Sequence, residues 1–435
     1  MAIVLAKEIS PARLAAFNIL QQVDTGAFSS VLLASEELRL QPADRALCHE
    51  LVLGVLRWQR YLDKIVEHFS KRRIESVDPA VRIALRLGLY QLRFLTRIPP
   101  SAAVNESVSL VRVARLSSAT AFVNALLRRA IREAEYDPAA EVADSVERIA
   151  VQTSHPGWLI DRWVKSFGVT DAEAFAHANN VVPPTAFRVV SSKANESEVL
   201  SKLSEAGATL ESSSVAQGAW RVSGATSLLR ELSAAGEIYL QDEASQLVAQ
   251  IVDAKPGERV LDLCAAPGGK TTQIADRSGA FIVAADLSSA RMHTIIATMR
   301  LHQLESISPV LLDATEQLPF APRSFDKVLV DAPCSGTGTL RRNPEIRWRL
   351  SPADFVRLAE QQKQILRRAI EMVKPGGHLI YSTCSVEHDE NEQVIQDVLD
   401  SDARFRHLNT IRTWPHRERS DGFFIAVFEA ADFRG

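Results

Sequence analysis

Residues 255–430 alternate short apolar runs with helical stretches, and this alternation constrains the fold more than any other feature. Nearly continuous apolar runs are typical of strands that are buried on both faces. The helical stretches between them, the longest over 353–373, predict a parallel sheet with helices on both sides. The runs lie at 259–264 (RVLDLC), 281–286 (FIVAAD), 308–313 (SPVLLD), 327–331 (KVLVD) and 378–383 (HLIYST).

The first of these strands leads directly into a loop that contains two glycines. Ligands of such sheets bind beyond the carboxyl ends of the strands, and glycine lets the backbone approach them closely. The loop lacks the leading glycine of a phosphate-binding P-loop and the spacing of a dinucleotide fingerprint. A nucleoside-type ligand remains, and S-adenosylmethionine fits; a plain tight turn is the alternative. The loop consists of Cys264, Ala265, Ala266, Pro267, Gly268, Gly269 and Lys270.

Acids at the ends of the next two strands favour the ligand interpretation over a plain turn. Asp286 ends the second strand, where an acid accepts hydrogen bonds from ribose hydroxyls. Asp313 ends the third strand, where we expect it to reach the edge of a base. Together with the loop, they predict a cofactor pocket.

Two cysteines follow the fourth and fifth strands, Cys334 in DAPC and Cys384 in STCS. Because the carboxyl ends of parallel strands meet at one edge, we expect both thiols on the ligand side of the sheet. A cysteine is usually a small buried hydrophobe, and this interpretation suits Cys48, which lies in a helical pattern. It suits the other two poorly, because they enter loops rich in Gly, Ser and Thr. No pair has metal-ligand spacing, so the sequence predicts no metal site.

Thiols beside a nucleoside-type cofactor point to methylation of cytosine. Carbon 5 of cytosine is a weak nucleophile, but addition of a thiolate to carbon 6 makes an enamine-like ring that accepts a methyl group from a sulfonium. The thiol needs polar or cationic neighbours to ionise, and Lys270 is a candidate. Asp331 is placed to hydrogen-bond the ring nitrogen and the amino group. A general base must then remove the carbon-5 proton.

The rest of the chain divides into two further regions. Residues 10–135 carry apolar side chains at three- and four-residue spacing, as in the continuous run 44–69, and predict a helical bundle with Asp78 as one cap. Residues 145–250 mix short β-type and helical runs, which suggests a small α+β layer. The predicted domains are an all-α bundle over 1–140, an α+β domain over 145–240 and an α/β Rossmann-like catalytic domain over 241–435.

The charge is distributed unevenly along the chain. The whole chain has a net charge of −3, whereas residues 1–132 hold 19 Lys and Arg against 11 Asp and Glu. A basic region suggests a polyanionic partner, and a solvated helical surface is the alternative. Lys71, Arg72 and Arg73 form the densest cluster. Arg341, Arg342 and Arg347 follow the Pro-Cys loop and are candidates for phosphate contacts, while Trp348 either stacks on a base or packs in the core.

Composition and cysteine usage exclude several classes of protein. Apolar residues make up 46% and charged residues 24% of the chain, as in globular proteins with large cores. No apolar stretch reaches the length of a membrane span, and the start MAIVLAKEIS predicts no secretory signal. Four cysteines without a dense framework indicate a reduced, cytoplasmic protein. Nothing indicates a stable protein partner.

Several motifs together resemble the Nop2/Sun/Fmu family of RNA cytosine-5 methyltransferases. They cover residues 237–430 in the family's order. The segments DRALCHELVLGVLRW and FVNALLRR resemble a NusB-like RNA-binding domain, a fusion found in bacterial 16S rRNA methyltransferases of the RsmB type. The catalytic motifs are QDEASQ, LDLCAAPGGKT, DAPCSGTG, RRNPEIRW and YSTCSVEHDENE.

The resemblance implies a role for each matching residue. Cys384 is the implied nucleophile, and Cys334 assists release of the methylated product. The segment 264–270 with Asp286, Asp313 and Asp331 binds the cofactor or lines its pocket. The implied substrate is 16S rRNA, with cytosine 967 as the target. The individual acids of HDENE have no assigned role.

Three alternatives remain open at this point. The first is the same methylation of cytosine in tRNA or 23S rRNA, and only the NusB-like helical region argues against it. A DNA cytosine methyltransferase would use the Pro-Cys thiol as nucleophile and leave the Thr-Cys motif unexplained. A non-catalytic antitermination factor would not need both Cys334 and Cys384.

Overall fold

The computed structural model describes residues 9–36, 39–402 and 404–431, and it divides into two compact units. The first comprises residues 1–182 and 340–349, and the second comprises 183–339 and 350–435. Residues 1–8, where the sequence predicts no secretory signal, lie outside the described part. Within the described residues no helix is long and apolar enough to cross a membrane.

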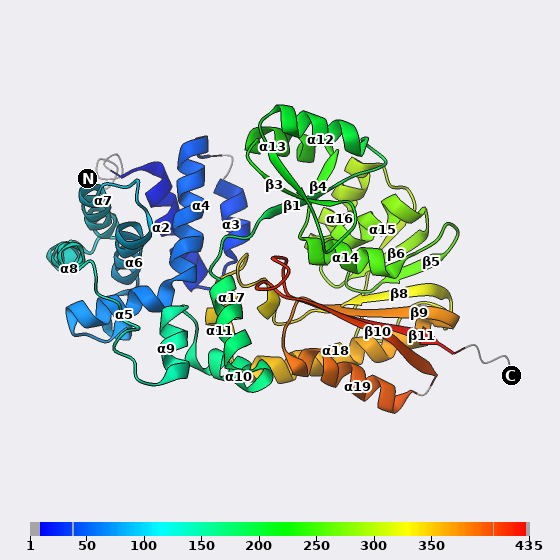
Figure 1. Ribbon diagram of the computed structural model, residues 1–435. Coiled ribbons are helices and arrows are strands. Elements are labelled where there is room, and N and C mark those ends of the chain that lie inside the picture. Colours follow the sequence, from blue (N-terminus) through cyan, green and yellow to red (C-terminus); the bar gives the residue numbers. More distant parts are fainter. Residues whose placement is uncertain (1–8, 37–38, 403, 432–435) are drawn as a thin grey trace. The chain divides into compact units, whose positions relative to one another are not determined.

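The described part of the first unit contains helices and no strands, and the helical prediction for residues 10–135 is confirmed (Figure 1). Apolar side chains from seven consecutive helices form one continuous core that includes Phe17, Leu51, Leu85 and Leu127. These helices are α2 (Pro11–Asp24), α3 (Ser29–Glu36), α4 (Pro42–Arg57), α5 (Gln59–Ser70), α6 (Pro79–Phe94), α7 (Pro100–Val113) and α8 (Thr120–Arg132).

Local sequence explains where two of these helices begin and end. Asp78 caps α6 as predicted, since its side chain accepts a hydrogen bond from the Ala80 amide at 2.9 Å and Pro79 follows it. The single helix predicted over 44–69 is wrong in one respect. The chain leaves helical geometry at Trp58, with φ −102° and ψ 15°, so two helices replace one. Trp58 stacks on Phe94 of α6, and this tertiary contact outweighs the continuous apolar pattern.

Three further helices belong to the helical unit, although the sequence placed them in the α+β domain. They are α9 (Ser145–Gln152), α10 (Gly157–Phe167) and α11 (Val169–Ala178). Arg60 of α5 donates to the His155 carbonyl at 2.8 Å and forms an ion pair with Glu147. These contacts explain why the helical unit extends to residue 182 and does not end near residue 145, where the sequence placed the domain boundary.

The segment 340–349 also belongs to the helical unit, although its flanks lie in the catalytic sequence. Glu345 is buried and accepts hydrogen bonds from the amide and hydroxyl of Ser29, at 2.9 and 2.8 Å. Arg57 donates to the Arg341 carbonyl at 2.8 Å, and Trp348 donates from Nε1 to the Leu56 carbonyl at 2.8 Å. The short helix α17 (Ile346–Arg349) is thereby held among α3 and α4.

The second unit opens with a four-stranded antiparallel sheet in the order β2-β3-β1-β4. Its βαββαβ connectivity is that of a ferredoxin-like layer. Two helices pack on the sheet through Phe187, Val199 and Leu232. The elements are β1 (Thr185–Val189), α12 (Glu196–Glu205), β2 (Thr209–Ser212), β3 (Ala219–Ser223), α13 (Thr226–Ala235) and β4 (Ile238–Leu240).

A seven-stranded sheet in the order β10-β11-β9-β8-β5-β6-β7 follows. Its five predicted strands are parallel, whereas β11 pairs antiparallel with both β9 and β10. The sheet is therefore mixed, and the predicted purely parallel sheet is wrong at this edge. The strands are β5 (Arg259–Asp262), β6 (Phe281–Asp286), β7 (Ile307–Leu311), β8 (Phe325–Asp331), β9 (Val373–Thr383), β10 (Phe405–Thr413) and β11 (Phe423–Ala430).

Helices cover both faces of this sheet, as the buried strands require (Figure 1). Val328, Leu379 and Phe424 face the helices α18 (Pro352–Met372) and α19 (Glu392–Ser401). Residues that alternate with them face the opposite layer, including Leu329 and Ile380. That layer is formed by α14 (Glu243–Val252), α15 (Gly269–Ser278) and α16 (Ser289–His302).

The helical unit offers a test of its packing at Gly54 of α4. A Cβ at this position would overlap the ring of Tyr90 on α6. We expect Gly54→Ala to lower the free energy of unfolding by about 1–3 kcal/mol, because overpacking outweighs the gain in helix propensity. Denaturant unfolding measures the change. In a double-mutant cycle, Gly54→Ala should lower the free energy of unfolding less in the Tyr90→Val background than in the wild type. Additive effects of the two substitutions would contradict the overlap.

Candidate active site

The thiols lie at the ends of neighbouring strands because β8 and β9 are paired in parallel register. Asp331, the last residue of β8, pairs with Ser382 of β9. Cys334 and Cys384 therefore enter the same edge of the sheet, and their Sγ atoms are 3.3 Å apart. The structure brings together the two cysteines that the sequence placed on adjacent strands.

The environment of Cys334 opposes ionisation of its thiol. The hydrogen bond to Cys384, burial and the negative charge of Glu390 together raise the pKa of Cys334 well above its ordinary value. Cys334 thus holds its proton at neutral pH and is suited to donate it to the sulfur of Cys384. A protonated thiol is a poor nucleophile, so this environment disfavours Cys334 as an attacking group.

Lys270 and Asp331 form an ion pair beside the thiols. The Lys270 Nζ lies 2.6 Å from Asp331 Oδ2, and the Ser382 hydroxyl donates to Asp331 Oδ1 at 2.6 Å. Burial lowers the pKa of Lys270, but Asp331 and the nearby Cys384 outweigh that effect, so the pKa is raised overall. Lys270 is a fixed positive charge whose field reaches Cys384, as the sequence suggested.

A cavity of about 160 Å³ lies over the loop that follows β5. Every residue of the predicted cofactor loop except Gly268 lines it, together with Asp331. The sequence missed four lining residues that come from the preceding segment, although the QDEASQ motif pointed to it. They are Tyr239, Leu240, Gln241 and Ser245.

The loop geometry suits a ligand that lies close to the backbone. Gly268 has φ +104°, which favours glycine, and a Cβ on Gly269 would lie 2.9 Å from the Tyr239 ring. Asp262 accepts a hydrogen bond from the Thr271 hydroxyl at 2.7 Å, while its other oxygen, Oδ1, is buried without a protein partner. Burial raises the pKa of Asp262 to about 7. An unpaired carboxylate oxygen beside a polar cavity fits a ligand with hydrogen-bond donors or positive charge.

The other two predicted acids lie at neighbouring strand ends but do not line this cavity. Asp286 is buried and accepts hydrogen bonds from the amides of Ala266 and Ser288, and Arg291 lies 3.0 Å from it. It ties the cofactor loop to β6. Asp313 accepts two hydrogen bonds from Thr315. Contacts of either acid with a ribose or a base stay predictions.

The arginines of the segment 340–349 do not form the predicted phosphate grip. Arg347 has no exposed surface and donates to the carbonyls of Ser154 and Asn179 and to the Asn180 side chain. Burial, with Arg57 nearby, lowers its pKa to about 9. Arg341 is also buried. The RNA-contact prediction is wrong for these two residues, because the segment is packed in the helical unit; for the partly exposed Arg342 it stays a prediction.

Trp348 packs against the helical unit through its hydrogen bond to Leu56, so the packing interpretation holds. Lys71, Arg72 and Arg73, in contrast, are exposed. The Arg72 guanidinium lies over the Phe122 ring, 5.4 Å from its centre, which places this cluster beside α8. Among the described residues, no group of three or more His, Cys, Asp or Glu is arranged to hold a metal ion.

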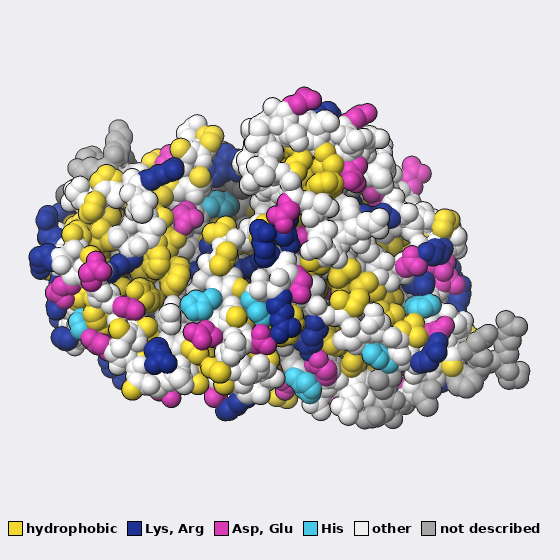
Figure 2. Space-filling view, in the orientation of Figure 1, with side chains coloured by type: hydrophobic (Ala, Val, Ile, Leu, Met, Phe, Trp, Pro, Cys, Tyr) yellow, Lys and Arg dark blue, Asp and Glu magenta, His cyan; other side chains and the backbone are white. Residues whose placement is uncertain are grey.

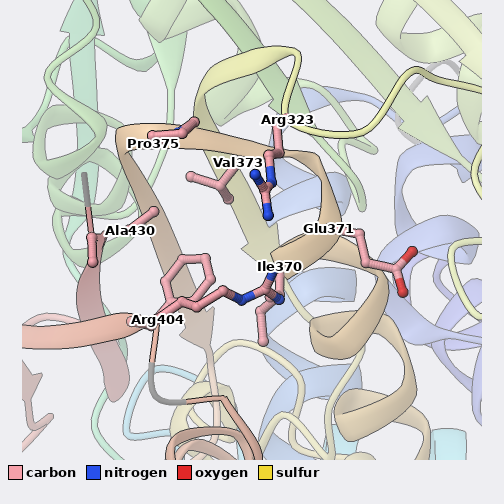
Figure 3. Close-up of a pocket in the computed structure, with 9 residues that line it drawn as sticks. Arg323, Ile370, Glu371, Val373, Pro375, Arg404 and Ala430 are labelled. Atoms are coloured by element: carbon pink, nitrogen blue, oxygen red, sulfur yellow. The ribbon is translucent and has the colours of Figure 1, made fainter. Parts of the chain in front are cut away.

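A second, smaller cavity of about 40 Å³ lies at the start of β9, away from the strand ends that carry the thiols (Figure 3). Arg323 and Arg404 extend toward it from two loops, and Val373 and Pro375 also line it, beside Arg323. Arg404 is already paired with Asp402. None of the predicted site residues lines this cavity, so we assign the active site to the cysteine edge.

Family models match all three regions of the chain. The model of the 16S rRNA methyltransferase RsmB/F matches residues 249–429. The NusB family matches residues 10–132, and the ferredoxin-like domain of RsmF/B-like methyltransferases matches residues 155–228. The matches lie in the order in which the sequence analysis placed the three folds.

Relatives align over nearly the full length of the chain. The probable ribosomal RNA small subunit methyltransferase B of Bacillus subtilis (strain 168) is 34% identical, over 92% of this chain and 94% of its own. The protein of the same name from Synechocystis sp. is 35% identical, over 97% and 99%. The chain belongs to the ribosomal RNA small subunit methyltransferase B family.

A solved structure supports the same assignment. The crystal structure of PH0851 superimposes with a TM-score of 0.83 at 27% identity, and covers 97% of this chain and 99% of its own. The fold of the family therefore extends over the helical unit as well as over the two sheets.

Asp262 generates a test of the site's electrostatics. Its folded pKa of about 7 exceeds the ordinary value near 3.9, so the protonated form is favoured in the folded state. Its contribution to stability is therefore present below about pH 4 and is lost as the pH rises to about 7.

We expect Asp262→Asn to gain stability relative to the wild type across this window, by on the order of 4 kcal/mol at most. Denaturant unfolding of the ligand-free protein at several pH values measures the difference. Asp253→Asn, at an exposed position, controls for loss of a carboxylate in general. A difference that stays constant from pH 4 to pH 7 would contradict the assignment.

Proposed function

We propose that the protein transfers a methyl group from S-adenosylmethionine to carbon 5 of a cytosine in 16S rRNA. The observation that carries the proposal is the pair of thiols 3.3 Å apart, together with the Lys270–Asp331 ion pair and the cavity of about 160 Å³ that these two residues help to line. From the family resemblance we infer cytosine 967 as the target and the cytoplasm as the place of action. The names of the relatives support rRNA as the substrate.

Cys384 attacks carbon 6 of the cytosine. The positive charge of Lys270 acts on this sulfur. The hydrogen bond to Cys384, burial and Glu390 raise the pKa of Cys334, so Cys334 stays protonated. Addition to carbon 6 makes carbon 5 nucleophilic. After methyl transfer a general base removes the carbon-5 proton. The electrons of that bond restore the ring double bond and expel the Cys384 sulfur from carbon 6, and the adjacent Cys334 thiol donates a proton to this sulfur.

Asp331 orients the base. Lys270 and Ser382 hold its two oxygens, so the carboxylate is fixed at the sheet edge where the ring must lie. In this position it orients the ring by accepting a hydrogen bond from the amino group of the cytosine.

S-adenosylmethionine supplies an electrophilic methyl group when it is bound. The residues 264–267 with Gly269 and Lys270 would form its pocket, and the unpaired Oδ1 of Asp262 would meet a donor of the ligand. Asp286 would position the loop through Ala266 and contact the ribose. Tyr239 closes the pocket on the side of the ferredoxin-like layer.

The helical unit binds the RNA in this proposal. Figure 2 shows dark blue side chains along the edge of this unit where Figure 1 labels α7 and α8. Arg112, Arg128 and Arg132 of these helices are exposed, as are the residues 71–73. An exposed basic surface attracts phosphates and makes binding depend on salt.

The two thiols give the sharpest test of the chemistry. Cys384→Ala should abolish methyl transfer and should form no covalent complex with RNA that contains 5-fluorocytosine. Cys334→Ala should still add to the base and transfer the methyl group, then accumulate as a covalent protein–RNA complex on a denaturing gel. Cys48→Ala, in the helical core, is the matched control.

The reverse pattern would exchange the roles of the two thiols. It would favour the mechanism expected of a DNA cytosine methyltransferase, in which the Pro-Cys thiol is the nucleophile. Full activity in both active-site variants would refute cysteine catalysis. A folded but inactive Cys384→Ala protein separates chemistry from stability, because loss of one partly buried sulfur costs only about 1 kcal/mol.

The basic cluster gives a test of RNA binding. We expect Lys71→Ala, Arg72→Ala and Arg73→Ala together to weaken binding of 16S rRNA fragments and to flatten the slope of log K against log salt by about 0.7–0.9 for each phosphate that is no longer neutralised. Filter binding at several salt concentrations measures the slope. The control removes three exposed charges from the other unit, Lys202, Arg230 and Lys255; equal effects of both triple variants would contradict a specific RNA surface.

A further inference from the structure

Four hydrogen-bond donors converge on one buried carboxylate, that of Glu390 in the HDENE motif. Its side chain has no exposed surface. Oε1 accepts from the Ser335 amide at 2.8 Å and from Gln362 Nε2 at 3.0 Å. Oε2 accepts from the hydroxyls of Ser335 and Ser385, each at 2.5 Å. The mechanism above uses none of these contacts.

The donors identify what Glu390 holds in place. Ser335 directly follows Cys334, and Ser385 directly follows Cys384. One carboxylate therefore bridges the two loops that carry the thiols. Gln362 adds α18 to the same cluster and also donates to the Pro333 carbonyl at 2.9 Å, on the other side of Cys334.

The next residue, Asn391, completes the arrangement around Cys384. Its Oδ1 accepts from the Thr383 hydroxyl at 2.6 Å, and its Nδ2 donates to the Ser385 carbonyl at 2.9 Å. The residues on both sides of the nucleophile are thus held by one side chain. Asn391 secures the Cys384 loop, whereas Glu390 joins this loop to that of Cys334.

We propose that Glu390 is a positioning residue, which fixes the Cys334 and Cys384 loops to each other so that the two thiols stay within contact distance during catalysis. The proposal rests on the cysteine mechanism stated above. Hydrogen bonds to a charged acceptor are short and strong, and a buried carboxylate accepts from all four donors without offering a competing proton. A displacement of one loop by about 1 Å costs roughly 10²-fold in rate.

The charge of Glu390 has a second consequence at the site. It contributes to the raised pKa of Cys334, after the hydrogen bond to Cys384 and burial. Removal of the charge therefore eases ionisation of the wrong thiol in addition to loosening the loops. Both effects predict slower methyl transfer without loss of cofactor binding.

Glu390→Gln is the decisive variant, because it keeps the size of the side chain but replaces one acceptor oxygen with an NH₂ group, which cannot accept hydrogen bonds from the surrounding donors. Glu392→Gln is the matched control, since this acid lies two residues away and pairs with Arg412 instead. In the full-length protein, kcat and the KM for RNA are measured for methyl transfer, together with S-adenosylmethionine affinity by calorimetry. We expect kcat of Glu390→Gln to fall by roughly 10²-fold, with cofactor affinity within about twofold of the wild type and Glu392→Gln near wild-type activity.

A second measurement reports the position of the thiols directly. Diamide takes two electrons and two protons from a pair of thiols, leaving a disulfide and the reduced hydrazine. In the wild type the Cys334–Cys384 disulfide should form quickly, because the sulfurs are already in contact. Peptide mass mapping follows its rate. Easier ionisation of Cys334 would by itself raise this rate in Glu390→Gln, so the several-fold drop that we expect there, with no change in Glu392→Gln, reports the loss of position. Protein that is folded by near-ultraviolet circular dichroism but slow in this reaction supports a positional role.

Wild-type kcat and wild-type disulfide rate in a folded Glu390→Gln protein would overturn the proposal. If this variant does not fold, Ser335→Ala combined with Ser385→Ala keeps Glu390 and removes only the two bridging hydroxyls, and the same two measurements decide. Failure of the cysteine mechanism is distinguishable, because it appears as an active Cys384→Ala protein whatever the behaviour of Glu390.

Discussion

The register between β8 and β9 is the constraint on which the site depends. Asp331 lies opposite Ser382, the two are joined by a side-chain hydrogen bond, and the Ala332 amide donates to the Ser382 carbonyl. Both strands thus end at the same level, and each leads into a loop that carries a cysteine. A shift of one residue would reverse the face of every side chain in one strand. The core residue Val328 of β8, or Leu379 of β9, would then leave its layer, so packing of the sheet and alignment of the thiols depend on the same register.

Electrostatics then gives each group at this edge a separate task. Lys270 is charged through its contact with Asp331, and it projects a positive field toward Cys384. The hydrogen bond to Cys384, burial and the charge of Glu390 oppose ionisation of Cys334.

Strand–helix alternation is enough to place the cofactor loop, Asp331 and both thiols on one sheet edge. The alternation is read from short stretches of sequence, and the carboxyl ends of parallel strands all lie at the same edge. The antiparallel strands β10 and β11 were missed, since they follow α19 without a helix between them and their pairing is set by distant partners. Trp58 interrupts a helix and stacks on Phe94 of α6. The spacing of apolar residues along the sequence does not reveal such a contact between helices. Glu390 was unassignable in the sequence, because its role depends on four donors from separate segments.

The arginines of 340–349 show a different limit of sequence reasoning. Proximity in sequence to the Pro-Cys loop suggested proximity to RNA, yet this stretch is a structural part of the helical unit. Arg347 is fully buried, and the backbone carbonyls of Ser154 and Asn179 accept its hydrogen bonds. Removal of the helices would leave Glu345, Arg347 and Trp348 without these partners, in a segment that follows the Cys334 loop directly in the sequence. For this reason the contribution of the helical unit to RNA binding is best measured by surface substitutions in the intact chain, because truncation would disturb the Cys334 loop at the same time.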